Sequence, residues 1–218
     1  MKQLLTVGDS FTYGEELSDR NQAWPQILAS KLDYQLLNLA EPAASNDKIL
    51  RKTMEHLSTE SVDLVIIGWS NIGRSEHADE FGYYDVWPGY QGNLFRKDGT
   101  EWRQELAGYV SKYHNSEAIH QKFLHQVILL QRYLESCNIQ YVMLNIVQNE
   151  YYKLKTLPGH AAYHRQINRE TFLGFNESGM LEWTYGCKTG PNNHFLEDGH
   201  TIVADKIYEH IRNLGWLS

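Results

Sequence analysis

The chain has 218 residues, a formal net charge of −7 and a hydrophobic content of 42%. This length predicts one domain with a sizeable core, and the hydrophobic content argues against disorder. The acidic balance argues against nucleic acid as a partner, because no basic stripe is available to neutralise phosphates. No apolar run is long enough to span a membrane and the N-terminus is not signal-like, so we expect no membrane partner and a cytoplasmic location. In such a reducing compartment, Cys137 and Cys187 are expected to be free thiols.

The first predicted element is an apolar run, Leu4 to Val7, that stops at Gly8 and is followed by Asp9 and Ser10. This pattern is typical of a buried strand that ends in a tight turn. Such a turn can present a serine hydroxyl at the carboxyl edge of a parallel sheet, where open α/β folds place their sites. Ser10 is therefore a candidate nucleophile, and Asp9 is expected to fix the turn, although Gly-Asp-Ser alone is also ordinary turn chemistry.

Strand-like and helix-like segments alternate along the rest of the chain. We expect strands at 34–39, 62–67 and 140–146, and helices at 24–32, from 46 to about 57, at about 117–136 and at about 196–213. Alternation of this kind predicts an α/β fold, in which helices cover both faces of a mostly parallel sheet. We expect one domain over residues 1–218, with insertions at about 75–115 and 148–190.

Both insertions carry side chains of interest. The first is rich in aromatic residues, including Trp87 and Trp102, and follows a strand directly, so its rings can cover the site and bind a sugar or acyl group, or pack only against one another. The second contains His160 and His164 at i, i+4 spacing, but no carboxylate or cysteine cluster completes a metal motif. No glycine-rich dinucleotide motif or Walker lysine is present. We therefore expect neither a metal nor a cofactor.

Near the C-terminus, His194 lies in a polar loop just ahead of an amphipathic helix, and it is followed by Gly199-His200 and Ala204. A serine after the first strand and a histidine before the last helix, in this spacing, resemble the SGNH (GDSL-like) hydrolase family. The resemblance implies a flavodoxin-like three-layer α/β/α sandwich. It also implies that Ser10 is the nucleophile of an ester hydrolase and that His194 is its general base.

The two intermediate family motifs are present with departures. In residues 37–49, Ala43 stands where the family has a glycine whose backbone N–H contributes to the oxyanion hole; alanine keeps that N–H only if the turn does not require positive φ. In Gly68-Trp69-Ser70-Asn71, Ser70 is in register with the family's asparagine donor and Asn71 comes one residue late. The expected oxyanion donors are thus the backbone N–H groups of Ser10 and Ala43, helped by Ser70 or Asn71.

The family's catalytic acid is missing, because the residue three positions before His194 is Pro191. We expect a backbone carbonyl of residues 189–192 to orient the imidazole instead. Two alternatives are open: a carboxylate from Glu197 or Asp198 takes this role, or the base is His200 with Glu197 as its acid. A further alternative is a site that has lost its activity.

The resemblance implies a small-molecule ester as the substrate, with a small acyl group or an O-acylated carbohydrate as the candidates. Asp9, Trp69 and Arg74 are the candidate substrate-binding residues, and Arg74 can read a carboxylate or phosphate of the substrate or pair with Glu76. Two other functions are open. The same serine can transfer the acyl group to a second substrate, or the pocket can bind glycans without catalysis.

Overall fold

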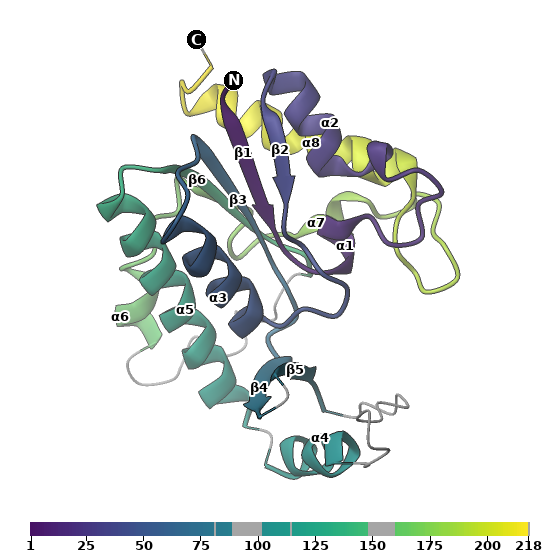
Figure 1. Cartoon of the computed structure of the whole chain (residues 1–218), viewed down its shortest axis with the longest axis vertical. Helices are drawn as coiled ribbons and strands as arrows, with labels where there is room; N and C mark the ends of the chain where they lie inside the picture. Colours follow the sequence, from purple (N-terminus) through teal and green to yellow (C-terminus); the bar gives the residue numbers. More distant parts are fainter. Residues whose placement is uncertain (81, 89–101, 114, 148–159, 218) are drawn as a thin grey trace.

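The computed structural model describes residues 1–80, 82–88, 102–113, 115–147 and 160–217 (Figure 1). Its centre is a five-stranded parallel sheet in the order β2-β1-β3-β6-β7. The strands are β1 (Gln3–Val7), β2 (Gln35–Asn38), β3 (Leu64–Trp69), β6 (Gln140–Asn145) and β7 (Phe172–Leu173). The predicted α/β fold with a parallel sheet is therefore confirmed. Strand β7 was not expected, because a two-residue strand has no recognisable periodicity.

Helices cover both faces of this sheet, which makes the three layers (Figure 1). One face packs against α3 (Asn46–Leu57) and α5 (Ser116–Ser136), and the other against α2 (Trp24–Leu32) and α8 (Glu197–Asn213). Side chains of a strand point alternately to the two faces. Accordingly Leu5 and Val7 of β1 belong to the first cluster of buried side chains, and Leu4 belongs to the second. All four of these helices lie within a few residues of their predicted positions.

Local signals explain where the helices begin. The Ser45 hydroxyl accepts a hydrogen bond from Lys48 N at 3.3 Å, and the Asn115 side chain accepts one from Ala118 N at 3.0 Å, so both residues cap helices. Pro25 occupies the first turn of α2, where its missing N–H has no cost. Within the described ranges, no helix combines the length and apolar character that a membrane span requires.

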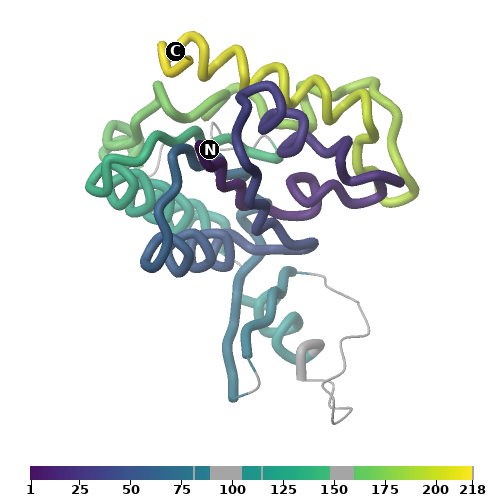
Figure 2. The backbone as a smooth tube through the Cα atoms, turned by 45° about the horizontal axis from the view of Figure 1, so that its top comes forward, coloured from purple at the N-terminus to yellow at the C-terminus, as the bar shows by residue number. Residues whose placement is uncertain are grey.

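The first predicted insertion forms an arm that projects beyond the carboxyl ends of the strands (Figures 1 and 2). It contains an antiparallel hairpin of β4 (Ser75–Asp79) and β5 (Gly82–Val86), followed by α4 (Trp102–Lys112). Of its aromatic residues, Phe81, Tyr90 and Phe95 and the side chain of Trp102 lie outside the described part of the chain.

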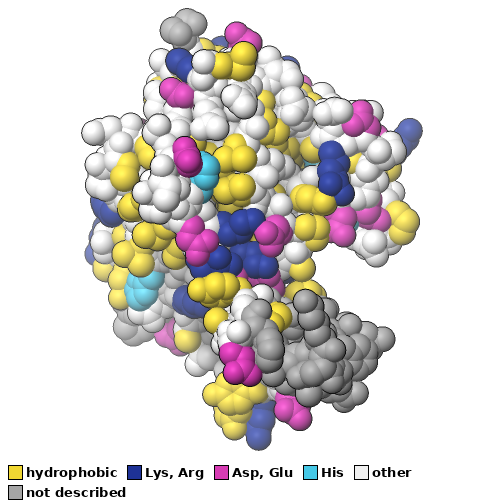
Figure 3. Space-filling model, viewed as in Figure 1, with side chains coloured by type: hydrophobic (Ala, Val, Ile, Leu, Met, Phe, Trp, Pro, Cys, Tyr) yellow, Lys and Arg dark blue, Asp and Glu magenta, His cyan; other side chains and the backbone are white. Residues whose placement is uncertain are grey.

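Ion pairs hold this hairpin against α3. Both oxygens of Glu76 accept hydrogen bonds from Arg51, at 2.8 and 2.7 Å, and Lys48 Nζ lies 2.5 Å from Asp85 Oδ2. The predicted pair of Arg74 with Glu76 is therefore wrong, because Arg51 is the partner of Glu76. Figure 3 shows Lys and Arg side chains interleaved with Asp and Glu between the body and the arm. Charged contacts of this kind place the arm beside the carboxyl ends of the sheet, where the candidate site lies.

Candidate active site

Ser10 is the first residue of α1 (Ser10–Tyr13), the short helix that starts directly after β1. Asp9 caps this helix, because its Oδ1 accepts a hydrogen bond from Phe11 N at 3.0 Å. Gly8 is required at the turn, since a Cβ there would collide with the Thr12 side chain. The first N–H groups of a helix have no partner within the helix, so the helix itself leaves the Ser10 N–H unpaired. The sequence prediction for this turn is confirmed.

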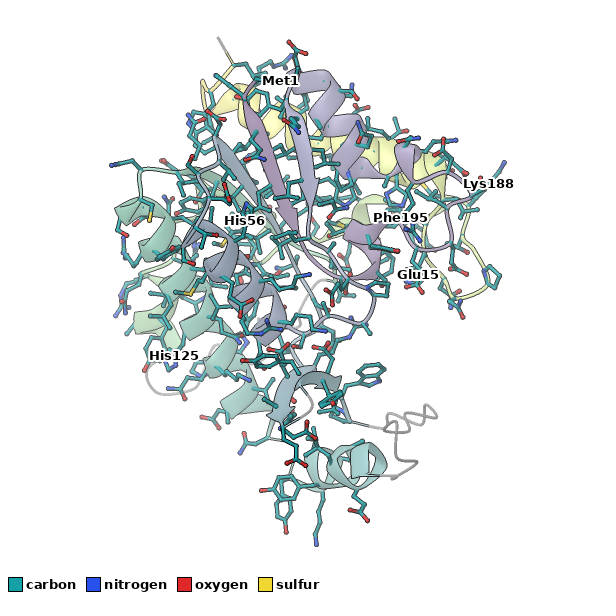
Figure 4. The ribbon with its side chains drawn as sticks, in the orientation of Figure 1. Met1, Glu15, His56, His125, Lys188 and Phe195 are labelled. Atoms are coloured by element: carbon teal, nitrogen blue, oxygen red, sulfur yellow. The ribbon has the colours of Figure 1, made fainter. Side chains whose placement is uncertain are left out.

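His194 reaches the same end of the sheet from a tight loop ahead of α8. Gly190 N donates to His194 O at 2.9 Å, and Thr189 pairs with Phe195 in an antiparallel bridge. The imidazole packs on Phe11, the residue after Ser10, with ring centroids 4.6 Å apart. Figure 4 shows this region near the labelled Glu15 and Phe195. The structure therefore brings together the two ends of the chain that carry the candidate nucleophile and base.

The imidazole is oriented by the side chain of Glu16, whose Oε2 lies 2.9 Å from His194 Nδ1. The expectation of a backbone carbonyl from residues 189–192 at this nitrogen is therefore wrong. The same carboxylate accepts hydrogen bonds from His194 N at 3.2 Å and Asn192 N at 2.8 Å. Gly190 makes room for it, because a Cβ there would lie 2.7 Å from the carboxyl carbon of Glu16.

These contacts determine how the histidine is protonated. A carboxylate can only accept, so Nδ1 carries the proton and Nε2 keeps a lone pair for a proton from the nucleophile. Burial tends to raise the pKa of Glu16, but the hydrogen bonds from Asn192 N and His194 outweigh it, and the pKa lies below its ordinary value. Glu16 therefore stays ionised at neutral pH. A second carboxylate, Glu15, has its Oε2 3.6 Å from His194 Nε2, beyond hydrogen-bond distance.

The alternative base, His200, has a structural role in α8. Its side chain is buried, its Nδ1 accepts a hydrogen bond from Trp24 N at 3.1 Å, and its ring meets Phe195 edge-on. Burial, with repulsion from His194, lowers the pKa of His200 to about 4. The hypothesis that His200 is the base is therefore wrong. Asp198, one of the two alternative carboxylates for orienting His194, instead accepts from Lys188 N and Gly199 N.

Ala43, the residue that replaces the family glycine, has φ of +63° and so does occupy the left-handed region. The expectation that Ala43 could supply its backbone N–H only in a turn without positive φ is wrong, because alanine adopts the left-handed conformation here. The Ala43 N–H makes no hydrogen bond to any residue that the structure describes. It remains a candidate oxyanion donor, in a strained backbone position.

The third motif differs most from the expectation. The Ser70 side chain is fully buried, and its hydroxyl donates to Asp9 Oδ2 at 2.7 Å. Ser70 therefore has no hydrogen left for an oxyanion, and its expected role as a donor is wrong. Asn71 is exposed, and its Oδ1 accepts from Gly73 N at 2.8 Å, within its own turn. The backbone of Ser70 is held by Asn46, whose Oδ1 accepts from Ser70 N at 2.8 Å.

Of the three candidate substrate-binding residues, two are buried in structural roles. Trp69 is fully buried and packs edge-on against Phe123, with ring centroids 5.6 Å apart, because β3 continues through this residue. Asp9 is also buried, and it pairs with Arg74 at 3.0 Å. Burial raises the pKa of Asp9, and the Arg74 charge and the Ser70 hydroxyl oppose the rise. Substrate contact is therefore wrong for Trp69 and Asp9, whereas Arg74, with a side chain 22% exposed, can still reach the site.

The second insertion contains α6 (His160–His164), β7 and α7 (Met180–Trp183). Its two histidines pack against His120 of α5, with centroids 4.9 and 5.7 Å from that ring. Among the described residues, no group of three or more His, Cys, Asp or Glu side chains is arranged to hold a metal ion. Cys137 and Cys187 are free thiols. Tyr151 and Tyr152 of this insertion lie outside the described residues.

A family model described as a family of unknown function (DUF6071) matches residues 12–218. The chain belongs to this family. Glu16 and His194 lie inside the matched region, and Ser10 lies just before it. No curated protein matches the chain.

Solved structures show which fold this family member has. TesA gives a TM-score of 0.60 at 15% identity, covering 98% of this chain and 99% of that chain. A lipolytic protein of the G-D-S-L family from Desulfitobacterium hafniense gives 0.52 at 14% identity, covering 96% and 99%. The acetyl xylan esterase Est2A from the rumen bacterium Butyrivibrio proteoclasticus gives 0.54 at 14% identity, with 100% of this chain but 65% of that chain covered. The fold is that of the SGNH (GDSL-like) hydrolases, as the motifs predicted.

Glu16 was not among the residues predicted for the site. The family pattern places a carboxylate just before the histidine, whereas Glu16 follows Ser10 by six residues, in Ser-Phe-Thr-Tyr-Gly-Glu-Glu. A signal was available, since two adjacent glutamates directly after a nucleophile turn lie close to the carboxyl edge of the sheet. Choosing between Glu15 and Glu16 required the backbone, because Glu16 has φ of +68°, which turns its side chain away from that of its neighbour.

Proposed function

We propose that this protein is a serine hydrolase that cleaves an ester through an acyl-enzyme on Ser10. The observation that carries the proposal is the 2.9 Å contact between Glu16 Oε2 and His194 Nδ1, on a ring that packs against the residue after Ser10. A carboxylate that fixes one imidazole nitrogen and leaves the other free is the arrangement a general base requires. The SGNH fold supports the assignment of Ser10 as the nucleophile.

The proposed reaction has two steps, acylation of Ser10 and hydrolysis of the acyl-serine. Ser10 Oγ attacks the ester carbon and its proton passes to His194 Nε2; the tetrahedral intermediate then expels the alcohol oxygen, which takes that proton. A water molecule attacks the acyl-serine in the same way, giving its proton to Nε2, and the carboxylic acid leaves as Ser10 regains its hydrogen. Glu16 stays ionised throughout and stabilises the imidazolium that forms between the transfers. The Ser10 and Ala43 N–H groups are the proposed backbone donors to the oxyanion.

As substrate we propose a small-molecule ester with a small acyl group, including O-acylated carbohydrates, in the cytoplasm. One structural neighbour, Est2A, is an acetyl xylan esterase. The Trp87 ring lies close to the site, because the Arg74 guanidinium carbon is 5.4 Å from its centroid and Arg74 pairs with Asp9. Aromatic faces beside charged groups suit sugar rings.

The proposal is tested by labelling with a fluorophosphonate probe and by hydrolysis of p-nitrophenyl acetate. We expect the probe to modify Ser10 of the wild-type protein, and both labelling and hydrolysis to be lost in Ser10→Ala. A folded wild-type protein that neither reacts with the probe nor hydrolyses the ester would contradict the proposal and favour a binding module without catalysis. Hydrolysis that survives in Ser10→Ala would show that another nucleophile acts.

A further inference from the structure

One guanidinium nitrogen touches all three turns that form the site. Arg74 Nη1 lies 3.0 Å from Asp9 Oδ2, 2.9 Å from Ser70 Oγ and 3.3 Å from Ala44 O. These partners follow β1, β3 and β2 respectively, and two of them adjoin Ser10 and Ala43, the residues that carry the proposed backbone donors. The Arg74 side chain therefore lies against the turns that carry both proposed backbone donors.

Neither side chain of the third motif is fixed as a donor to the oxyanion. The Ser70 hydrogen is committed to Asp9. The Asn71 side chain is exposed, its Oδ1 accepts from Gly73 N, and its Nδ2 makes no hydrogen bond to a described residue that would hold it toward the site. With only the two backbone N–H groups, the oxyanion would have two hydrogen-bond donors, one fewer than in the SGNH family that this sequence resembles.

Arg74 has donors to spare. A guanidinium carries five N–H groups in a rigid planar fork. All three contacts above involve Nη1, and neither Nε nor Nη2 of Arg74 hydrogen-bonds to any residue that the structure describes. The side chain as a whole is 22% exposed, so it is not sealed inside the protein. Because Asp9 and Ser70 anchor one end of the fork, the other end is held in place before a substrate arrives.

We propose that Arg74 is the third oxyanion donor and takes the place of the missing asparagine amide. This inference rests on the proposed function of Ser10. As the bond from Ser10 Oγ to the ester carbon forms, the carbonyl π electrons move to its oxygen, and the free N–H edge of Arg74 binds that oxygen. Arginine stays protonated in proteins, so it donates hydrogen bonds without transferring a proton. A cation gains far more from a full oxyanion than from a neutral carbonyl, so the contact acts mainly in the transition state.

The test is Arg74→Lys, which keeps the positive charge for Asp9 but loses the second arm of the fork. We expect kcat for p-nitrophenyl acetate to fall about 10²–10³-fold, as when other oxyanion donors are removed, with KM nearly unchanged. The affinity for a neutral aryl boronic acid, which forms a tetrahedral adduct on Ser10, should fall in parallel. The matched control is Arg51→Lys, which weakens the other arginine contact of the same hairpin, to Glu76, and should leave both quantities unchanged.

Each outcome decides the inference. If Arg74→Lys hydrolyses the ester at the wild-type rate, or lowers only the melting temperature, Arg74 is structural and the proposal is overturned. The same conclusion follows if Asn71→Ala shows the loss instead. If Arg74→Lys does not fold, the double variant Arg74→Met with Asp9→Asn removes every side-chain N–H of residue 74 without leaving a buried charge at residue 9. It should lose kcat and boronate affinity relative to Asp9→Asn alone, and equal values in the two variants would overturn the proposal. Failure of the fluorophosphonate to label wild-type Ser10 would refute the proposed function itself, which is a separate result.

Discussion

The Glu16 carboxylate lies 2.9 Å from Nδ1 of His194, although 178 positions separate the two residues in the sequence. The proposed acid and nucleophile therefore share one short segment, from Ser10 to Glu16, and the C-terminal loop supplies only the base. Four N–H groups of that loop converge on the two oxygens of Glu16: the backbone and side-chain amides of Asn192, and the backbone and ring of His194. The carboxylate thus fastens the loop to the N-terminal segment and orients the imidazole.

Glu16→Gln is expected to lower kcat for p-nitrophenyl acetate by about 10²–10⁴-fold while Ser10 stays in place. Glutamine has one acceptor oxygen instead of two, so some of the N–H groups that Glu16 binds lose their partner. The amide also carries no charge to stabilise the imidazolium. Steady-state kinetics give the loss of kcat.

The neighbouring carboxylate provides the control. Glu15 lies 3.6 Å from His194 Nε2 and makes no hydrogen bond there, so Glu15→Gln should change kcat much less than Glu16→Gln. Equal losses in the two variants, or a larger loss in Glu15→Gln, would show that the acid has been assigned to the wrong glutamate.

Most of the fold could be predicted because its elements carry regular apolar periodicity. The four longer strands of the central sheet, and α2, α3, α5 and α8, appear close to where the pattern placed them. Strand β7 and the hairpin of the arm were missed, since one is two residues long and charged contacts rather than apolar periodicity hold the other to α3. The end of β3 was placed too early, which made the buried Trp69 look like a loop residue.

The site was predictable only as far as it follows family spacing. Ser10 and His194 could be proposed from the sequence because each has a fixed place beside a strand or helix, and their catalytic roles stay predictions. Glu16 and the Asp9–Ser70–Arg74 network could not be, because such contacts depend on how separate turns meet in space. Sequence register placed Ser70 at the donor position, but register does not reveal that its hydroxyl is used by Asp9.

Trp87→Ala is expected to raise KM for a bulky aryl ester or an acetylated sugar far more than KM for p-nitrophenyl acetate. The reason is position: the Trp87 ring lies 5.4 Å from the Arg74 guanidinium, at the side of the site that faces the arm. The matched control is Tyr109→Ala on α4, whose ring is 61% exposed. Equal changes in KM for large and small esters, with a lower melting temperature, would show that Trp87 only packs the arm against the body.

Ala43→Gly is expected to stabilise the protein by about 0.5–1 kcal/mol. Relief of the left-handed strain at φ of +63° stabilises the glycine variant by about 1–2 kcal/mol. The greater freedom of glycine in the unfolded chain destabilises it by about 0.5–1 kcal/mol. Urea unfolding of both proteins measures the difference. The backbone N–H is unchanged, so activity should be retained. A less stable Ala43→Gly protein would mean that packing of the alanine methyl group outweighs the strain.

His200 is expected to make the protein less stable in mild acid without taking part in catalysis. Its pKa is about 4 in the folded state because it is buried, against an ordinary 6.5. Between these values the unfolded chain binds a proton that the folded protein does not, so stability is full above pH 6.5 and falls as the pH drops towards 4. The loss is about 2 kcal/mol at pH 5 and about 3 kcal/mol below pH 4. His120, whose pKa is also about 4, adds a loss of the same sign. The free energy of unfolding in urea should therefore differ less between pH 7 and pH 5 for His200→Gln than for the wild type, since glutamine cannot titrate but can still accept from Trp24 N.

The same variant tests which histidine is the base. At pH 7 the His200→Gln protein should hydrolyse p-nitrophenyl acetate, whereas His194→Ala should not. An inactive, fully folded His200→Gln protein beside an active His194→Ala protein would reverse the assignment of the base.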